Sequence, residues 1–242
     1  MIRILTTCYN AQPYIGKTIT SIKAQKNTDW HCYITDDIST DDSVKLIKEL
    51  IKDDNRFTLI VNENKHYQPG NYWQILQHKE INDNDICITV DGDDWLPNHD
   101  VLDNVLRYYE DPNIWVTCGQ FLQWHGSNKF SRGFTAQPDT FESLRTQPWR
   151  SSHLRTFKAW LFRRIKEEDL RAPNGNFWEV TGDLSFMYPM LEMAGLERVH
   201  YTTDINYIYN IETTLNDFKV NLRKQLRYAK MIRGKKPYDY IT

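Results

Sequence analysis

The chain has 242 residues, 40% of them hydrophobic, which is enough for one sizeable core without a second domain. Its 30 Lys and Arg residues against 32 Asp and Glu give a net charge of −2, which excludes a protein whose main partner is nucleic acid. No apolar run approaches the roughly 20 residues that span a bilayer, and the strand-like start leaves no room for a signal peptide. We therefore expect a cytoplasmic protein, at most peripherally attached to a membrane.

The first 120 residues alternate short β-branched runs with segments of helical period. This alternation is typical of an α/β domain, in which helices cover both faces of a mostly parallel central sheet. The sequence predicts strands at 2–7, 31–35, 57–61, 86–90 and 115–119.

The segments between these strands carry apolar residues at helical spacing. One helix places Tyr14, Ile15, Thr18, Ile19 and Ile22 on a single face. The next is expected to begin with Ser39 as its cap and to bury Val44, Ile47 and Ile51. Two further helices are predicted at 72–76 and 100–109.

The regular alternation fades after residue 120. Residues 121–150 mix Gly and Pro, Pro138 among them, with polar and aromatic residues, which predicts a long excursion at the mouth of a site. Helical patterns return at 158–165 and 184–194, an aromatic strand is expected at 207–209, and a basic amphipathic helix covers 218–236.

Polar residues follow three of the predicted strands. In open α/β sheets, ligands bind beyond the carboxyl ends of the strands, so residues at these points are candidates for a site. The three clusters are Thr7-Cys8-Tyr9-Asn10, Asp36-Asp37 and Asp91-Gly92-Asp93-Asp94.

The third cluster is the most informative. It puts three carboxylates at the end of an apolar strand, where their mutual repulsion is unfavourable unless a cation is present. Carboxylates combined with phosphate oxygens suit Mg²⁺ or Mn²⁺. A surface Asp-Gly turn is the alternative for this cluster, and a helix-capping turn is the alternative for Asp36 and Asp37.

Other catalytic plans fit this sequence poorly. It contains no Gly-x-Ser-x-Gly elbow, no Gly-x-Gly-x-x-Gly after the first strand and no Walker-type phosphate loop. It also has no His-x-x-x-His pair for a zinc site. His66 and His153 stand alone in the sequence and are open to either a structural role or a substrate contact.

These motifs together resemble the family-2 glycosyltransferases of the GT-A fold. Residues 4–10 look like the opening strand and Tyr-Asn turn of that family, and Asp36-Asp37-Ile38-Ser39-Thr40-Asp41 is similar to its Asp-Asp-Gly-Ser-Thr-Asp. Ile38 in place of glycine implies a slightly different turn. Asp91-Gly92-Asp93-Asp94 with the downstream Pro97 looks like the metal-binding motif of the family.

The resemblance implies a role for each of these residues. Asp93 would be the main metal ligand for Mn²⁺ or Mg²⁺, and Asp91 would support it or contact the ribose. Asp37 would bind the nucleobase, usually uracil, and Asp94 would hold the loop or contact the donor. Thr7, Tyr9, Asn10 and Gly92 complete the nucleotide-sugar contacts that the resemblance implies.

Asp183 resembles the catalytic base of inverting members. It stands in Thr181-Gly182-Asp183, which follows Trp178-Glu179 and leads into an apolar helix. Its alternative role is that of a helix N-cap.

The resemblance implies an inverting transfer of a sugar from a nucleotide diphosphate, usually UDP, to a hydroxyl on a glycan, a lipid-linked sugar or a protein-linked sugar. A sugar nucleotidyltransferase and a non-catalytic nucleotide-sugar-binding module are the alternatives. In this interpretation residues 1–217 form the glycosyltransferase domain, with 1–120 binding the nucleotide sugar and 121–217 binding the acceptor.

Residues 218–242 form a basic tail in this interpretation. Eight Lys and Arg residues between 219 and 236 accompany apolar residues at roughly helical spacing. The tail can pack on the domain with a solvated charged face, or attach peripherally to an anionic membrane or glycan acceptor.

Overall fold

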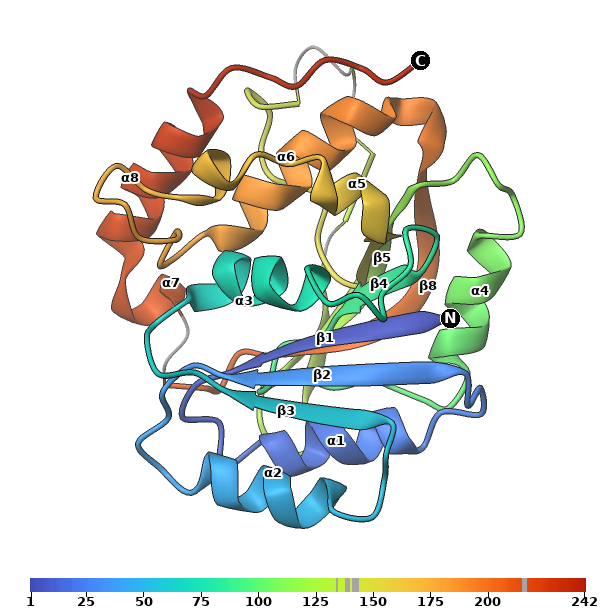
Figure 1. The fold of residues 1–242 in the computed structure, drawn as a ribbon, viewed down its shortest axis with the longest axis vertical. Coiled ribbons are helices and arrows are strands. Elements are labelled where there is room, and N and C mark those ends of the chain that lie inside the picture. The colour runs from blue at the N-terminus through green and yellow to red at the C-terminus, as the bar shows by residue number, and fades with distance from the viewer. Residues whose placement is uncertain (134, 138–139, 141–143, 215–216) are drawn as a thin grey trace.

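The computed structural model describes residues 1–133, 135–137, 140, 144–214 and 217–242. Its sheet has the strand order β3-β2-β1-β4-β7-β5-β6, and β8 pairs with β5 (Figure 1). The strands are β1 (Ile2–Cys8), β2 (Trp30–Asp36), β3 (Phe57–Val61), β4 (Ile86–Thr89), β5 (Val116–Trp124), β6 (Phe130–Arg132), β7 (Arg155–Lys158) and β8 (Val199–Asn210).

The sheet is mostly parallel where the sequence predicts it to be. β1 pairs in parallel with both β2 and β4, β2 pairs in parallel with β3, and β8 runs parallel to β5. Consequently β1 to β4 all end at one edge of the sheet, which lies on the left of Figure 1 for β1 to β3. The polar clusters that follow β1, β2 and β4 are thereby brought to that edge.

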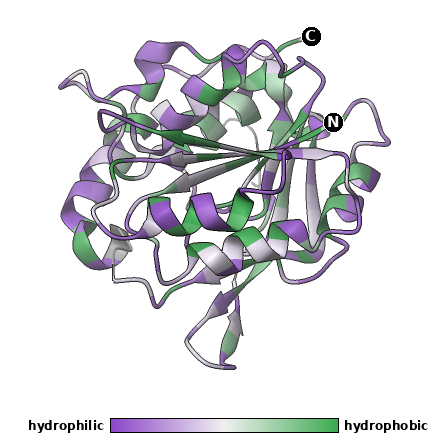
Figure 2. Ribbon diagram, turned by 60° about the horizontal axis from the view of Figure 1, so that its bottom comes forward, coloured by the Kyte–Doolittle hydropathy of each residue, from purple (hydrophilic) through white to green (hydrophobic). Residues whose placement is uncertain are grey.

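Helices cover both faces of the sheet, as Figures 1 and 2 show from two directions. In Figure 2 the hydrophobic residues gather on the strands and on the helix sides that face them, while the outer loops are mostly hydrophilic. The helices are α1 (Ile15–Lys23), α2 (Ser43–Ile51), α3 (Tyr67–Leu76), α4 (Val101–Tyr108), α5 (Ala159–Arg163), α6 (Gly182–Ala194), α7 (Asp217–Val220) and α8 (Leu222–Arg233).

Two hydrophobic clusters result from the alternation of side chains along the strands. Ile4 of β1 and Ile88 of β4 belong to the cluster shared with α1, α2 and α4. Leu5 and Cys87, one position along each strand, belong to the cluster shared with α3, α5 and α6. Both faces of the sheet are therefore buried, as the near-continuous apolar strands require.

The structure corrects the prediction of an irregular excursion over 121–150. β5 extends to Trp124 and forms an antiparallel hairpin with β6, so this stretch is more regular than an excursion. β7 is antiparallel to both β4 and β5, and it occupies residues before the helix expected at 158–165. Pro138 lies outside the described residues.

The start of α2 is also corrected. The helix begins at Ser43 rather than after Ser39, because the Ser39 hydroxyl already donates to Asp36 Oδ2 and accepts from the Asn10 amide. Of the three residues expected on its buried side, Ile47 is buried while Val44 and Ile51 are half-buried.

The C-terminal helical stretch is divided into α7 and α8 instead of forming one helix. The inner side of α8 packs on the domain: Tyr228 and Ile232 are buried, and the Tyr228 and Trp178 ring centroids are 5.0 Å apart. The division of the chain at residue 217 stays a prediction. No helix among the described residues has the length and apolar character needed to cross a membrane.

Candidate active site

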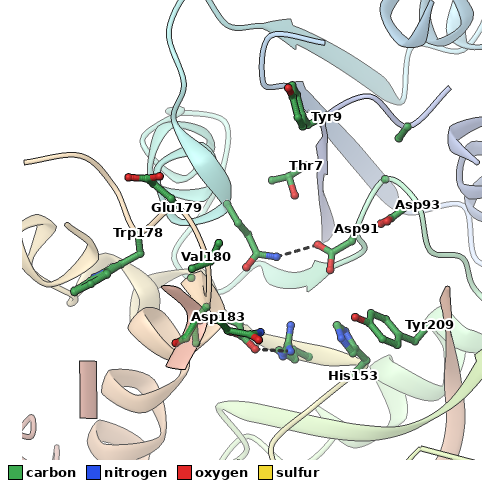
Figure 3. A pocket seen from close by; sticks show the side chains of 17 residues that line it. Thr7, Tyr9, Asp91, Asp93, His153, Trp178, Glu179, Val180, Asp183 and Tyr209 are labelled. Carbon is green, nitrogen blue, oxygen red and sulfur yellow. Dashed lines mark hydrogen bonds and ion pairs between the residues drawn. The ribbon is translucent and has the colours of Figure 1, made fainter. Parts of the chain in front are cut away.

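Two neighbouring cavities open at the carboxyl edge of β1, β2 and β4. The first has a volume of about 340 Å³ and the second about 500 Å³, and both are lined by Thr7, Tyr9 and Gln68. The first is also lined by Asp91, Gly92, Asp93, His153, Arg155, Asp183 and Tyr209 (Figure 3), and the second by Asp37, Lys65, Asn71, Val220 and Lys224.

The loop after β4 carries the carboxylates of the first cavity. Gly92 is required here because a Cβ at this position would lie 2.9 Å from the Thr7 carbonyl oxygen, and the Gly92 amide donates to that same oxygen over 2.9 Å. This close approach aligns the loop with the end of β1. Asp91 and Asp93 consequently face the same cavity as Thr7.

Asp94 has a different position from its neighbours. It is 1% exposed, lines neither cavity, and its two carboxylate oxygens accept hydrogen bonds from the Tyr207 hydroxyl at 2.7 Å and the Asn210 amide at 2.7 Å. Burial, followed by the charges of Asp93 and Asp91, raises the pKa of Asp94 well above its usual value. Of the two roles expected for Asp94, these contacts favour holding the loop.

Asp91 and His153 show how the cavity can receive a cation. The pKa of Asp91 is raised, mainly by burial and further by the negative charge of Asp183. The positive charge of Arg155 and a hydrogen bond from Gln68 act in the opposite direction. Burial and the Arg155 charge lower the pKa of His153 well below 6.5, so its imidazole is neutral. Ligand atoms of Asp91, Asp94 and His153 lie within 4.8 Å of one another. Crowded carboxylates beside a neutral imidazole fit a divalent metal ion.

Asp183 lies on the opposite side of the first cavity from Asp91 (Figure 3). It stands in the first turn of α6, whose start lies so close to α3 that a Cβ on Gly182 would be 2.7 Å from the Pro69 ring. Asp183 Oδ2 accepts from Arg155 over 2.8 Å, and Oδ1 accepts from the Leu184 amide over 3.0 Å. Arg155 is 4% exposed and fixes this carboxylate toward the cavity.

Asp37 is the buried carboxylate of the second cavity. Its Oδ1 accepts from the Asn62 side chain and the His66 amide, and its Oδ2 accepts from the Tyr67 amide at 2.9 Å. Oδ2 can therefore accept one more hydrogen bond from a ligand. The buried Asn71 Nδ2 has no hydrogen-bond partner among the described residues, so a ligand can find both an acceptor and a donor here.

Tyr9 lines both cavities. Tyr9 is 44% exposed, and Lys65 Nζ lies 3.0 Å from its ring centroid. An exposed aromatic ring held by a cation is suited to stack on a planar or sugar ring. Asn10 lines neither cavity; its side-chain oxygen instead accepts from the Thr40 amide at 2.7 Å, which ties the β1 turn to the β2 turn.

Four non-glycine residues with positive φ lie around these cavities. Asn10, Ile38, Tyr67 and Thr181 have φ values between 48° and 65°, and each lines a cavity or is adjacent to a residue that does. Ile38 occupies the left-handed region that favours glycine, which is unfavourable for a β-branched residue. Such local strain clusters at functional sites because the surroundings impose it there.

Several residues of the cavities were missed in the sequence. Gln68, Arg155, Tyr209 and Gln225 line the first cavity, and Lys65, Asn71 and Lys224 line the second. No pattern in the sequence marked Arg155, because the strand that carries it, β7, was not predicted. Conversely, none of the described residues between 121 and 150 lines either cavity, so the structure does not place that stretch at their mouths.

Comparisons with known proteins show the family and the fold of this chain. Residues 3–171 match the model of the family described as glycosyl transferase family 2. A 50-residue stretch, 21% of this chain, is 48% identical to the teichoic acid poly(glycerol phosphate) polymerase of Staphylococcus epidermidis and covers 7% of that protein.

Two solved structures share the fold over nearly the whole chain. S. aureus TarS 1–349 in complex with UDP-GlcNAc has a TM-score of 0.70 at 13% identity, with 96% of this chain and 66% of that chain covered. The mannosyltransferase PcManGT from Pyrobaculum calidifontis, in complex with GDP-Man and Mn²⁺, has a TM-score of 0.67 at 17% identity, with coverages of 98% and 65%. This chain thus spans about two thirds of those solved chains.

Proposed function

Because the chain belongs to glycosyl transferase family 2, we propose that it is an inverting, metal-dependent glycosyltransferase that uses a nucleotide-diphosphate sugar, most simply a UDP-sugar. The observation that carries the proposal is the meeting of Asp91, Asp93 and Asp183 in one cavity, although they stand at the end of β4 and the start of α6. The second cavity, with Asp37 and Tyr9, adjoins it and receives the nucleoside in this proposal.

In the nucleoside cavity, Oδ2 of Asp37 accepts a ring N–H of the base, and Asn71 Nδ2 donates to a carbonyl oxygen of the base. Uracil offers both groups. Tyr9 packs against the nucleoside, and Thr7 lies where the two cavities meet. The mannosyltransferase complex contains GDP-Man, so the same fold also accommodates a guanine nucleotide in another protein. The choice of uracil for this chain is therefore proposed from Asp37 and Asn71 and not from the fold.

Asp91 and Asp93 would hold the metal ion in this proposal. His153, which has a ring nitrogen within 4.8 Å of an Asp91 carboxylate oxygen, would be the nitrogen donor. A mixed oxygen and nitrogen donor set favours Mn²⁺ over Mg²⁺, because imidazole suits transition metals better than magnesium. When bound, the ion supplies positive charge that stabilises the departing diphosphate.

Asp183 acts as the general base. Its carboxylate takes the proton of the acceptor hydroxyl, the acceptor oxygen bonds to the anomeric carbon, and the bond from that carbon to the diphosphate oxygen breaks. Arg155 orients Asp183 through their 2.8 Å ion pair. Attack from the side opposite the leaving group inverts the anomeric configuration, and a positioned base accelerates the step by roughly 10²–10⁴-fold.

We further infer a cytoplasmic location, peripheral to a membrane, with a glycan or a lipid-linked sugar as the acceptor. The cysteines of the described residues are all free and buried, as is typical of a reducing compartment. Lys219, Arg223 and their basic neighbours on the outer side of the C-terminal helices support contact with an anionic surface.

A thermal-shift screen of UDP-, GDP- and dTDP-sugars with and without Mn²⁺ tests the donor, since a ligand that binds only the folded state raises its melting temperature. We expect one nucleotide class to stabilise the protein, and to do so more strongly with Mn²⁺. Metal-dependent hydrolysis of that donor distinguishes an enzyme from a binding module. Stabilisation by none of the donors would contradict the proposal.

A further inference from the structure

The outer side of α7 and α8 exposes apolar residues of the tail for which the sequence left open either packing on the domain or attachment to an anionic surface. Val220 is 58% exposed, Leu222 52% and Leu226 63%, whereas Tyr228 and Ile232 on the opposite side of α8 are buried. Leu222 and Leu226 are one turn apart and so lie on the same side of the helix. The apolar residues of this segment thus divide into one set that packs and one set that faces solvent.

Basic residues share this solvent side. Arg223, Arg227 and Lys230 are exposed, lie at helical spacing beside the two leucines, and form no ion pair with a described residue. We call Leu222, Arg223, Leu226, Arg227 and Lys230 the outer face of α8.

The inner basic residues behave differently. Lys224 pairs with Glu179, Lys235 pairs with Asp169, and Arg233 donates to the carbonyl oxygens of Arg145 and Gln147. These contacts fix α8 on the domain without any help from the outer face. The exposed leucines and arginines are consequently not needed to hold the helix in place.

The charge of the outer face differs in sign from that of the whole chain. Residues 219–236 contain no Asp or Glu, although the chain as a whole has a net charge of −2. A helical face that combines exposed leucines with Lys and Arg, and carries no acidic residue, matches the acyl and headgroup layers of an anionic bilayer. The charges of an acidic soluble protein would pair with the Lys and Arg residues, but they would not bury the leucine side chains.

The outer face lies beside the cavities. Val220 and Lys224 line the second cavity, and Gln225, between Lys224 and Leu226, lines the first. A surface in contact with α8 is therefore close to the cavity mouths.

We propose that the outer face of α8 docks the protein on an anionic phospholipid surface, with the cavities beside the membrane-water interface. The part of the proposal that concerns an acceptor carried by that membrane rests on the proposed function, whereas the docking itself does not. Each Lys or Arg near an anionic surface strengthens binding about fivefold, so three of them contribute on the order of a hundredfold.

The test is co-sedimentation of the full chain with vesicles of phosphatidylcholine alone and of phosphatidylcholine mixed with phosphatidylglycerol, without any donor. We expect binding to the mixed vesicles only, and its release by high salt. Replacing Arg223→Gln together with Arg227→Gln should weaken the partition by more than about tenfold. Leu222→Gln with Leu226→Gln should weaken it at low salt as well.

The matched control is Lys45→Gln with Lys48→Gln on α2, which removes the same charge from exposed helical positions elsewhere. This control should bind like the unmodified protein. None of the substituted side chains lines a cavity, so donor binding in solution should be unchanged in every variant.

Equal binding to neutral vesicles, or full binding by the arginine variant, would overturn the proposal. Absence of vesicle binding would also overturn it. If sedimentation velocity then showed a dimer that the leucine variant abolishes, the outer face would instead join two copies of the chain. A protein that docks on vesicles but binds no nucleotide sugar would leave the docking intact and contradict the proposed function instead.

Discussion

Asp93 is the side chain that tests the cation site most directly. It is half-buried in the first cavity, and its backbone carbonyl oxygen accepts from Asn210 Nδ2 at 3.1 Å, a contact that survives loss of the side chain. Asp93→Ala should therefore fold normally but bind the donor at least about tenfold more weakly in the presence of Mn²⁺.

Isothermal titration with Mn²⁺ and nucleotide measures this loss. Asp103→Ala, which removes an exposed carboxylate on α4, is the control and should bind like the unmodified protein. Unchanged nucleotide affinity in Asp93→Ala would rule out the metal role of this residue.

Asp183 and Arg155 separate chemistry from binding. Asp183→Asn keeps the shape of the side chain but removes the proton acceptor, so kcat should fall by at least about two orders of magnitude while donor KM changes little. Arg155→Lys keeps the positive charge but loses the guanidinium geometry that contacts Asp183 at 2.8 Å, and should lower kcat less.

Steady-state kinetics with the identified donor supplies both values. A near-normal kcat in Asp183→Asn would leave this residue a structural role only, as the partner of Arg155 and as an acidic residue in the first turn of α6.

For single residues, the sequence predicts the carboxylates of the site but not the side chains that contact them. Asp37, Asp91, Asp93 and Asp183 could be selected because each stands in a recognisable motif, and the structure places all of them at a cavity. Gln68 and Arg155 could not be selected, because single polar residues in a helix or short strand carry no pattern. Their importance comes only from contacts made over long sequence separations.

Among the elements, α8 depends on a buried ionic contact. Arg145 forms a bidentate ion pair with Glu192 of α6, and its Nη1 donates to the Ile232 carbonyl oxygen at 2.6 Å. The two side chains are 9% and 3% exposed. Arg145→Met should lower the free energy of unfolding by about 3 kcal/mol, because it leaves the Glu192 charge buried without its partner.

A second substitution tests that reason. Arg145→Met combined with Glu192→Leu removes both charges and should be more stable than Arg145→Met alone in urea titrations. A double variant that is less stable than the single one would show that the loss comes from packing and not from the unpaired charge.

The elements themselves were predictable in proportion to their periodicity. β1 to β4 and α1 show strong apolar runs or stripes, and the structure confirms them within a few residues. β7 was missed because four residues leading directly into a helix give no alternation that stands apart from the helical pattern. The β5-β6 hairpin was missed because its turn residues lie in a polar stretch that also fits an irregular loop.

For the whole molecule, the order of the strands in the sheet could not be predicted from the sequence. Alternating strands and helices predict a parallel sheet, but the insertion of β7 between β4 and β5 is decided by long-range packing. This insertion brings His153 and Arg155 against the loop after β4. The mixed character of the sheet is thus the reason that a nitrogen donor and a guanidinium join the carboxylates predicted for the site.

The stability of the whole molecule at acid pH should depend on Asp85, which links the N-terminus to β4. Its Oδ2 accepts from Arg3 Nε at 2.7 Å, and the two side chains are 6% and 8% exposed. Burial alone would raise the pKa of Asp85, but the hydrogen bonds from Arg3 and the Asn82 amide and the positive charges of Arg3 and the N-terminus outweigh it, so the pKa lies below 3.8.

A carboxylate whose pKa is depressed by folding stabilises the native state above its unfolded pKa of about 3.9, and that stabilisation is lost as the pH falls through the folded pKa. Asp85→Asn should therefore lower the free energy of unfolding by about 3 kcal/mol near neutral pH, and the difference from the unmodified protein should shrink below about pH 4. Urea titrations over a pH series measure this difference.

The control is Asp83→Asn, because Asp83 pairs with Arg163 at 2.6 Å while its side chain is 69% exposed. A solvated pair of this kind contributes at most about 1 kcal/mol. Equal losses in the two variants, or a difference for Asp85→Asn that does not change with pH, would contradict the buried ion pair as the source of the stability.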